Sequence, residues 1–166
     1  MGAVVALKKA PKNSGLIPPY IALTTPLGRF SEAGFLGSRY KPYATGGDPN
    51  AKVFAAEGIV TEGITRERQE RRRDLLAQLD TLGKKHPSPL FEAIDKNREE
   101  AYALILGEPG KVFDLSREKD AVRDRYGRST FGQSCLAARR LIEQGVVYVS
   151  VNYPGWDTHK QHFNAM

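Results

Sequence analysis

Apolar positions follow no regular spacing in residues 1–63, whereas helical and strand-like spacing dominates the rest of the chain. Glycine and proline interrupt residues 15–63 repeatedly, and only Tyr20–Thr25 within them has a composition typical of a strand. Residues 1–10 open the chain with an apolar stretch that suits either a helix or a strand. We therefore expect residues 1–63 to form an irregular, Gly/Pro-rich segment with a short strand or two, which lies over a scaffold formed elsewhere.

Residues 64–145 have the apolar spacing of helices. The predicted helices begin at Thr65, Pro89, Ser116 and Ser129 or Thr130, and they end near Leu82, Leu106, Tyr126 and Gly145. Their expected core-facing residues are Leu75, Leu79 and Leu82 in the first helix, Leu90, Ile94, Ala101 and Ile105 in the second, and Phe131, Cys135, Ala138, Leu141 and Ile142 in the fourth. This section therefore predicts a helical segment between the irregular start and the end of the chain.

A run rich in β-branched residues, Val146–Val151, follows Gly145 and predicts a buried strand. The order helix, glycine, apolar strand and loop is typical of an α/β fold with a mainly parallel sheet, and this class, rich in helix, is the predicted fold. The chain offers one or two strands for four helices, so we expect a single truncated domain over residues 1–166 whose sheet is partly encoded elsewhere. Residues 146–166 would then form the last strand and the loop that carries the chemistry.

The loop after this strand contains a carboxylate and an imidazole two residues apart, Asp157 and His159. Because ligands in open α/β sheets bind outside the carboxyl ends of strands, this position suits a functional site. Asp and neutral His are also a favourable ligand pair for a divalent metal. Gly155 permits a tight exit from the strand, Trp156 can anchor the loop by packing, and Thr158 supports it. The alternative is an Asp157 that accepts loop amides and supports His159 without any metal.

Other candidate residues are weaker. His162 extends the pattern and could contribute a third ligand, although a surface side chain is the favoured interpretation. Cys135 lies on a helix stripe with no histidine nearby in the sequence, which favours a buried thiol over a nucleophile. Arg128 and Gln133 suit helix docking as well as substrate contact. The sequence therefore assigns no catalytic or substrate-binding residue.

Composition and charge narrow the classes of function. No apolar run approaches the roughly 20 residues of a membrane span, and the lysines of residues 1–10 follow the apolar stretch, which is the wrong order for a secretory signal. The single cysteine excludes an internal disulfide. The net charge of +6 points to nucleic acid, but its excess lies in residues 65–74, where Glu67 and Glu70 stand at pairing distance from Arg71 and Arg73. A solvated helix face is therefore favoured over a nucleic-acid site.

Residues 126–145, the strand and Gly155–His159 together resemble the middle of a bacterial group called domain of unknown function 1501. Shorter stretches are similar in the same order, namely Gly34–Gly37, Gly46–Pro49, Arg72–Leu75 and Val112–Leu115. That group is related to sulfatases and belongs to the alkaline-phosphatase-like superfamily. One departure is Pro154, where the group often has a second glycine, because proline fixes φ and removes an amide donor.

The resemblance implies a partial alkaline-phosphatase-like α/β sandwich with metal ions at one edge of the sheet. It assigns Asp157 and His159 to the metal, without distinguishing zinc, manganese or calcium. Members of the group are typically exported, so a leader and a metal-binding segment would precede Met1, and an acidic, histidine-bearing segment would follow Met166. We therefore expect a fragment of a metal-dependent hydrolase of phosphate or sulfate esters, acting on small-molecule or glycan substrates and inactive as this chain alone.

Two alternatives to a hydrolase remain at this point. The first is a non-catalytic binding or structural protein that retains the fold. The second is a basic nucleic-acid-binding module built on the arginine-rich helix near residues 65–74, which the interleaved carboxylates disfavour. Metal content separates the hydrolase from the first alternative, and the salt dependence of nucleic-acid affinity separates it from the second.

Overall fold

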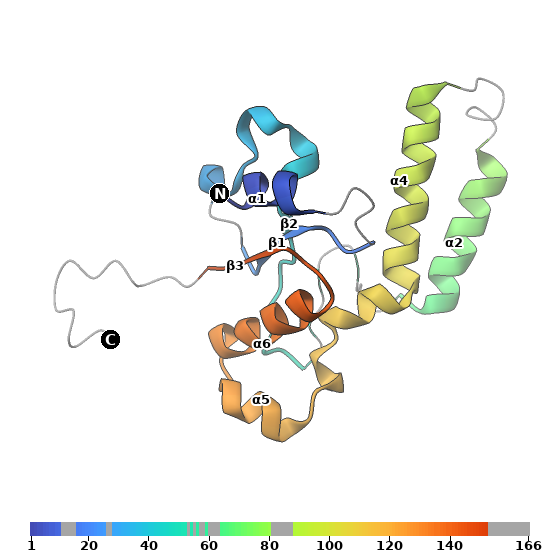
Figure 1. The fold of residues 1–166 in the computed structure, drawn as a ribbon. Helices are drawn as coiled ribbons and strands as arrows, with labels where there is room; N and C mark the ends of the chain where they lie inside the picture. Colours follow the sequence, from blue (N-terminus) through green and yellow to red (C-terminus); the bar gives the residue numbers. More distant parts are fainter. Residues whose placement is uncertain are drawn as a thin grey trace.

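The computed structural model of the chain describes residues 1–10, 16–25, 28–52, 54, 56, 59, 64–80 and 88–152 (Figure 1). Within these residues β1 (Tyr20–Leu23), β2 (Tyr43–Ala44) and β3 (Tyr148–Val151) form one parallel sheet in the order β2-β1-β3. Ile21 lies opposite Tyr43 on one side and opposite Val149 on the other, so β1 is the central strand. The predicted mixed α/β class with a parallel sheet is confirmed.

The two faces of the sheet are covered by different helices, α1 (Gly2–Lys9) and α6 (Thr130–Glu143), as Figure 1 shows. Side chains alternate along β1, so Ile21 and Leu23 enter the main core with α6, and Tyr20 lies against α1. A Cβ at Gly2 would come within 2.5 Å of the Tyr20 ring, so this glycine sets how closely α1 approaches the sheet. Residues 1–10 are therefore helical, one of the two alternatives left open by the sequence.

The connection from α6 to β3 follows the predicted pattern. Ser129 caps α6 by accepting a hydrogen bond from the Gly132 amide at 3.1 Å, and Gly145 ends the segment with a φ of +88°. The predicted apolar stripe of this helix is wrong in part, because Phe131 and Ile142 are exposed. The buried face instead includes polar residues whose hydrogen bonds are satisfied internally, and its members are Gly132, Gln133, Ser134, Leu136, Ala137 and Leu141.

Short 3-10 helices connect the longer elements. They are η1 (Gly28–Ser31), η2 (Gly34–Leu36), η3 (Ser38–Tyr40), η4 (Glu108–Phe113) and η5 (Leu115–Arg117). The predicted helix from Ser116 to Tyr126 is divided into η5 and α5 (Asp120–Tyr126). Ser116 caps neither of them, because Asp114 accepts its amide at 3.0 Å and caps η5.

The helices α2 (Arg66–Leu79) and α4 (Pro89–Leu106) lie side by side and antiparallel, and they project from the body of the molecule (Figure 1). Thr65, where the first helix was expected to begin, caps α2 by accepting a hydrogen bond from Arg68 N at 3.3 Å. Ser88, which the sequence analysis did not single out, caps α4 by accepting from Phe91 N at 3.3 Å. Their predicted burial is wrong: α2 has no buried residue, and Leu104 is the buried residue of α4. The apolar stripes are present in the sequence, but no described residues bury them.

The main core lies between the sheet, α6 and the segments around η4. Its largest fully buried side chains include Phe113, Ile21, Leu23, Leu136 and Leu141. The expected buried strand, β3, is half-buried along its whole length, because it pairs with β1 on one side and is the outer strand of the described sheet. No helix among the described residues is long and apolar enough to cross a membrane.

Candidate functional site

The carboxyl ends of the three parallel strands meet at one edge of the sheet. Thr45, which follows β2, is fully buried there and accepts the Thr24 amide at 3.0 Å with its hydroxyl oxygen. The Thr45 amide donates to Ala22 O at 3.0 Å, and the Gly46 amide donates to Thr24 O at 3.0 Å. These bonds hold the exits of β1 and β2 together in a fixed arrangement, which defines the candidate site.

Thr24 adopts a backbone conformation that its side chain disfavours. Its φ is +63°, and it has the only positive φ of a non-glycine residue within the described part of the chain. A β-branched residue in the left-handed region is a genuine outlier, with a typical cost of about 1–3 kcal/mol. Such strain is concentrated at functional sites, and here it occurs where β1 delivers the chain to the carboxyl edge.

Gly46 and Gly47 extend the edge into a tight loop. Both have positive φ, 60° and 62°, which requires glycine. The loop then turns at Asp48, whose carboxylate accepts the Asn50 amide at 2.9 Å. Asn50 in turn donates its side-chain amide to Arg128 O at 3.0 Å, one residue before the cap of α6. The loop after β2 is therefore fastened beside the amino end of α6, a helix end whose dipole favours negative charge.

Arg128 has its charge satisfied by two carboxylates at this helix start. Its guanidinium donates to Asp120 at 2.7 Å and to Asp124 at 2.5 Å. The hydrogen bond from Arg128 lowers the pKa of Asp120, and the bonds to Asp120 and then Asp124 raise the pKa of Arg128. This arrangement fixes the α5–α6 connection and supports the docking interpretation of Arg128.

Gln133 also has a structural explanation. Its buried side-chain oxygen accepts from Arg123 Nε at 2.8 Å, and its amide nitrogen donates to Arg123 O at 2.9 Å and Gly127 O at 2.8 Å. Both amide protons and the oxygen are engaged, so no polar atom of Gln133 is left for a substrate. Cys135 is only partly buried, less than the buried thiol that the sequence favoured, and this burial raises the pKa of the thiol.

The residues predicted to carry the chemistry lie outside the described part of the chain. They are Gly155, Trp156, Asp157, Thr158, His159 and the weaker candidate His162. The described chain ends at Asn152, directly after β3, so these residues follow the strand that leaves the sheet at the carboxyl edge. Among the residues that the structure describes, no three His, Cys, Asp or Glu side chains form a metal-binding group.

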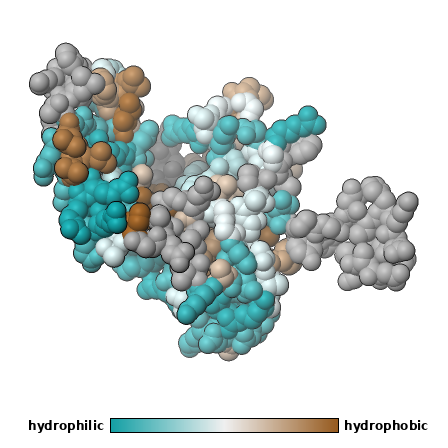
Figure 2. All heavy atoms as spheres, turned by 180° about the vertical axis from the view of Figure 1, so that it is seen from behind, coloured by the Kyte–Doolittle hydropathy of each residue, from teal (hydrophilic) through white to brown (hydrophobic). Residues whose placement is uncertain are grey.

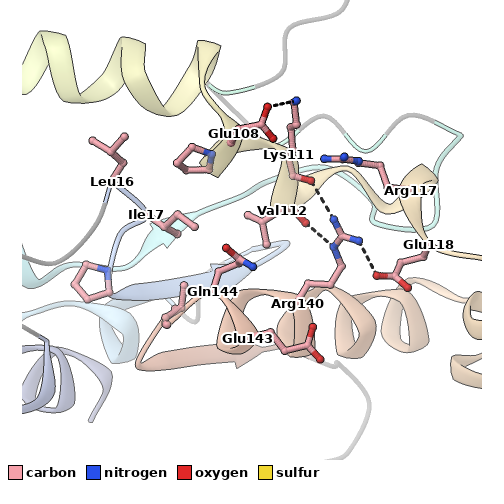
Figure 3. A pocket seen from close by; sticks show the side chains of 14 residues that line it. Leu16, Ile17, Glu108, Lys111, Val112, Arg117, Glu118, Arg140, Glu143 and Gln144 are labelled. Atoms are coloured by element: carbon pink, nitrogen blue, oxygen red, sulfur yellow. Dashed lines mark hydrogen bonds and ion pairs between the residues drawn. The ribbon is translucent and has the colours of Figure 1, made fainter.

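A pocket of about 650 Å³ lies at the opposite edge, beside the amino ends of β1 and β3 (Figure 3). Its charged residues largely neutralise one another, since Lys111 pairs with Glu108 and Arg140 with Glu118 at 2.7 Å. Arg140 also donates to Val112 O at 2.9 Å, so it clamps η4 to α6. Ligands of parallel sheets bind at carboxyl edges, so we favour that edge over this pocket as the functional site.

The arginines of α2 form a mixed surface rather than a uniform basic stripe. Glu70 pairs with Arg66 at 3.0 Å, and Arg73 pairs with Asp74 at 3.0 Å, so the expected pair between Glu70 and Arg73 does not form. A backbone hydrogen bond and then a hydrogen bond with Thr65 lower the pKa of the Glu67 carboxyl, and the charge of Arg71 lowers it by a smaller amount. The carboxylates thus interrupt the positive charge, as the sequence indicated.

Sequence reasoning missed Thr24 and Thr45 as members of the site. Two signals were present: Thr24 follows a predicted strand directly, and Thr45 precedes the pair Gly46 and Gly47, which is typical of a left-handed turn. Neither signal indicates that β1 and β2, about 20 residues apart in the sequence, pair as parallel neighbours. Only the structure of the sheet shows this pairing.

The parallel sheet and the helices on both of its faces define a mixed α/β protein, and its strained carboxyl edge is the candidate site. The chain belongs to the family described as "Protein of unknown function (DUF1501)", whose profile matches residues 1–166. Comparisons with curated proteins and with solved structures find no match. The resemblance to this family seen in the sequence is therefore confirmed, and the family description names no biochemical activity.

Proposed function

We propose that this chain forms part of a metal-dependent hydrolase of phosphate or sulfate esters, related to the sulfatase-like group of the alkaline-phosphatase-like superfamily. Asp157 and His159 supply two ligands of a divalent metal, with Gly155, Trp156 and Thr158 shaping their loop. The observation that carries the proposal is the direction of β3, which runs parallel to β1 and β2. The chain therefore leaves β3 at the same edge as the strained Thr24.

The donor set supports a divalent metal. A carboxylate and an imidazole suit zinc or manganese, and calcium prefers oxygen ligands, so the pair does not single out one ion. When bound, such a metal polarises the ester and activates a nucleophile. Catalytic sites of this kind use about three protein ligands, so we expect Asp157 and His159 to be completed by groups encoded outside these 166 residues.

The carboxyl edge has features that suit an anionic ester. The amino end of α6 lies beside the loop after β2, and helix amino ends favour negative charge. The bonds among Thr24, Thr45 and Gly46 keep the edge rigid, so a ligand there meets a preorganised backbone. A non-catalytic protein that retains this edge is the alternative proposal, and metal binding without turnover would favour it.

Metal analysis of the full-length protein tests the proposal. We expect bound divalent metal in the purified protein and its loss in Asp157→Ala and His159→Ala, because each substitution removes one ligand. His162→Ala is the matched control and is expected to retain the metal. Equal metal content in Asp157→Ala and the unsubstituted protein would refute the assignment.

Activity gives a second test, with 4-nitrophenyl phosphate and 4-nitrophenyl sulfate assayed in zinc, manganese or calcium. The full-length protein is expected to hydrolyse one of these esters, and the 166-residue chain to show little or no turnover. Robust turnover by the 166-residue chain, abolished in Asp157→Ala, would show instead that this chain holds a complete site.

A further inference from the structure

The pocket beside the amino ends of β1 and β3 combines an apolar floor with a charged rim (Figure 3). Its volume of about 650 Å³ lies within the range of small-molecule sites, which have a mainly apolar lining and a few polar groups that orient the ligand. The apolar side chains come from the segment before β1, from η4 and from the segment that leads into β3, and they are Leu16, Ile17, Pro19, Pro109, Val112 and Val146. Val112 and Val146 are also members of the main core, so the packed core forms the floor of the pocket.

One cation at the rim of this pocket has no ionic partner. The pocket is lined by three cations and three carboxylates. Two of the carboxylates, Glu118 and Glu143, pair with arginines of α6 at 2.7 and 3.3 Å. The third carboxylate, Glu108, pairs with Lys111. Arg117 forms no ion pair with any residue in the described part of the chain, so its charge is available to a ligand.

Glu108 indicates which chemical group the rim favours. The hydrogen bond and the charge of Lys111 lower the pKa of this carboxyl, and the charge of Arg117 lowers it by a smaller amount, so both cations lie close to it. The pair of Lys111 and Glu108 is exposed, with 44% and 79% of the two side chains accessible. Exposed pairs of this kind contribute little to stability, so a ligand carboxylate can replace Glu108 at little cost.

The pocket differs from the exposed apolar surface of the α2–α4 hairpin, which Figure 2 shows and which includes Leu79 and Leu90. An exposed apolar surface indicates that something covers it but does not specify the chemistry of the partner. The pocket has its unpaired cation and its apolar floor in one site. Both parts of a ligand are therefore specified, an anionic head and an apolar body.

We propose that this pocket binds a small monocarboxylate with an aliphatic chain, such as a medium-chain fatty acid. The carboxylate lies between Lys111 and Arg117, where the planar guanidinium of Arg117 suits two parallel hydrogen bonds to the carboxylate oxygens. The aliphatic chain covers Ile17 and Val112. Lys111, Arg117 and Glu108 together have a net charge of +1, which one carboxylate neutralises.

This site lies at the opposite edge of the sheet from the strained Thr24, because its lining includes the residues just before β1 and β3. The proposal therefore does not rest on the proposed hydrolase function. A protein without metal or esterase activity would still be expected to bind the carboxylate.

Isothermal titration calorimetry of the purified protein with hexanoate, octanoate and decanoate tests the proposal. We expect the affinity to rise about 3- to 4-fold for each methylene group that enters the pocket, because each removes apolar surface from water. Octylamine and 1-octanol retain the chain and change the head group. They are expected to bind at least about 10-fold more weakly than octanoate, because neither accepts a charge-assisted hydrogen bond pair from Arg117. An absence of saturable binding, or equal affinity for octanoate and 1-octanol, would overturn the proposal.

Two substitutions at the rim are expected to act in opposite directions. Arg117→Gln should weaken octanoate binding about 5- to 10-fold, because it removes the unpaired cation. Glu108→Gln should tighten it about 2- to 5-fold, because it removes the carboxylate that competes for Lys111 and Arg117. Both substituted side chains are exposed, so the far-ultraviolet circular dichroism should be unchanged.

Arg72→Gln is the matched control. Arg72 is an exposed arginine of α2 that forms no ion pair within the described residues and does not line the pocket. Its substitution is expected to leave octanoate binding unchanged. Equal losses of affinity in Arg117→Gln and Arg72→Gln, or weaker binding in Glu108→Gln, would show that the carboxylate does not lie between Lys111 and Arg117.

Discussion

At the scale of single residues, Thr24 and Thr45 show how the carboxyl edge is held. Thr24 has an unfavourable φ of +63°. The buried Thr45 hydroxyl oxygen accepts a hydrogen bond from the Thr24 amide. The strained conformation therefore persists because its amide has a buried partner. This pair keeps the exit of β1 rigid at the edge where the proposed metal loop begins.

Thr45→Val tests that coupling, because valine keeps the shape and removes the acceptor of the Thr24 amide. We expect the free energy of unfolding to fall by about 1–3 kcal/mol, the cost of leaving a buried donor unsatisfied. Urea denaturation measures the change. Thr45→Ser retains the hydroxyl and should cost less, so equal losses in the two variants would contradict the role given to the hydroxyl.

Asp120 gives a prediction about pH. Its hydrogen bond from Arg128 lowers its pKa, so the ion pair stabilises the folded state above the ordinary pKa of an aspartate. That contribution is lost as the pH falls through the lowered pKa of the folded state. Titration by NMR should show the Asp120 midpoint rising towards its ordinary value in Arg128→Gln. An unchanged midpoint would show that Arg128 does not control this carboxyl.

At the scale of elements, Arg140 connects α6 to the segment that follows α4. Its guanidinium donates to Val112 O, to Lys111 O at 3.0 Å and to Glu118 at 2.7 Å, as Figure 3 shows. The ion pair is largely buried, with 14% and 18% of the Arg140 and Glu118 side chains exposed. The planar fork of arginine suits these three acceptors, which a lysine cannot match.

Arg140→Gln should destabilise the fold by about 3 kcal/mol, because it leaves the mostly buried Glu118 without its main partner. Chemical denaturation measures this loss, and Arg140→Lys is expected to recover only part of it. Arg66→Gln removes an exposed arginine with a single carboxylate partner and serves as the control, with an expected change below about 1 kcal/mol. A similar loss in both glutamine variants would argue against the clamp.

The apolar stripes of the helices show that periodicity predicts where a helix forms but not which of its residues are buried. The spacing of Leu90 and Ile94 correctly predicted α4, yet both residues are exposed. Periodicity depends on the geometry of one helix, whereas burial depends on what lies opposite it. In α6 the opposite case occurs, because the polar residue Gln133 is not part of the apolar stripe and yet is fully buried. Its side chain is buried with its hydrogen bonds satisfied inside the protein, which the spacing of apolar residues does not predict.

At the scale of the whole molecule, the parallel sheet brings the end of β3 to the carboxyl edge, and the proposed metal ligands follow β3 in the sequence. A metal that binds the folded state alone stabilises it by mass action. We therefore expect a chelator to lower the Tm of the full-length protein and to leave the Tm of Asp157→Ala unchanged. Differential scanning calorimetry measures both. Equal shifts in the two proteins would show that the metal binds elsewhere.

The sequence by itself determined the helices from Pro89 and from Thr130, the cap of the second of these at Ser129, the last strand and the family. These features depend on local spacing, capping and turn chemistry, which neighbouring residues specify. Only the tertiary structure decided that β1 lies between β2 and β3, that Thr24 meets Thr45 and that the leucines of α2 and Leu90 of α4 are exposed. Contacts between distant segments follow from how whole faces pack together, and no local pattern encodes which face each element meets.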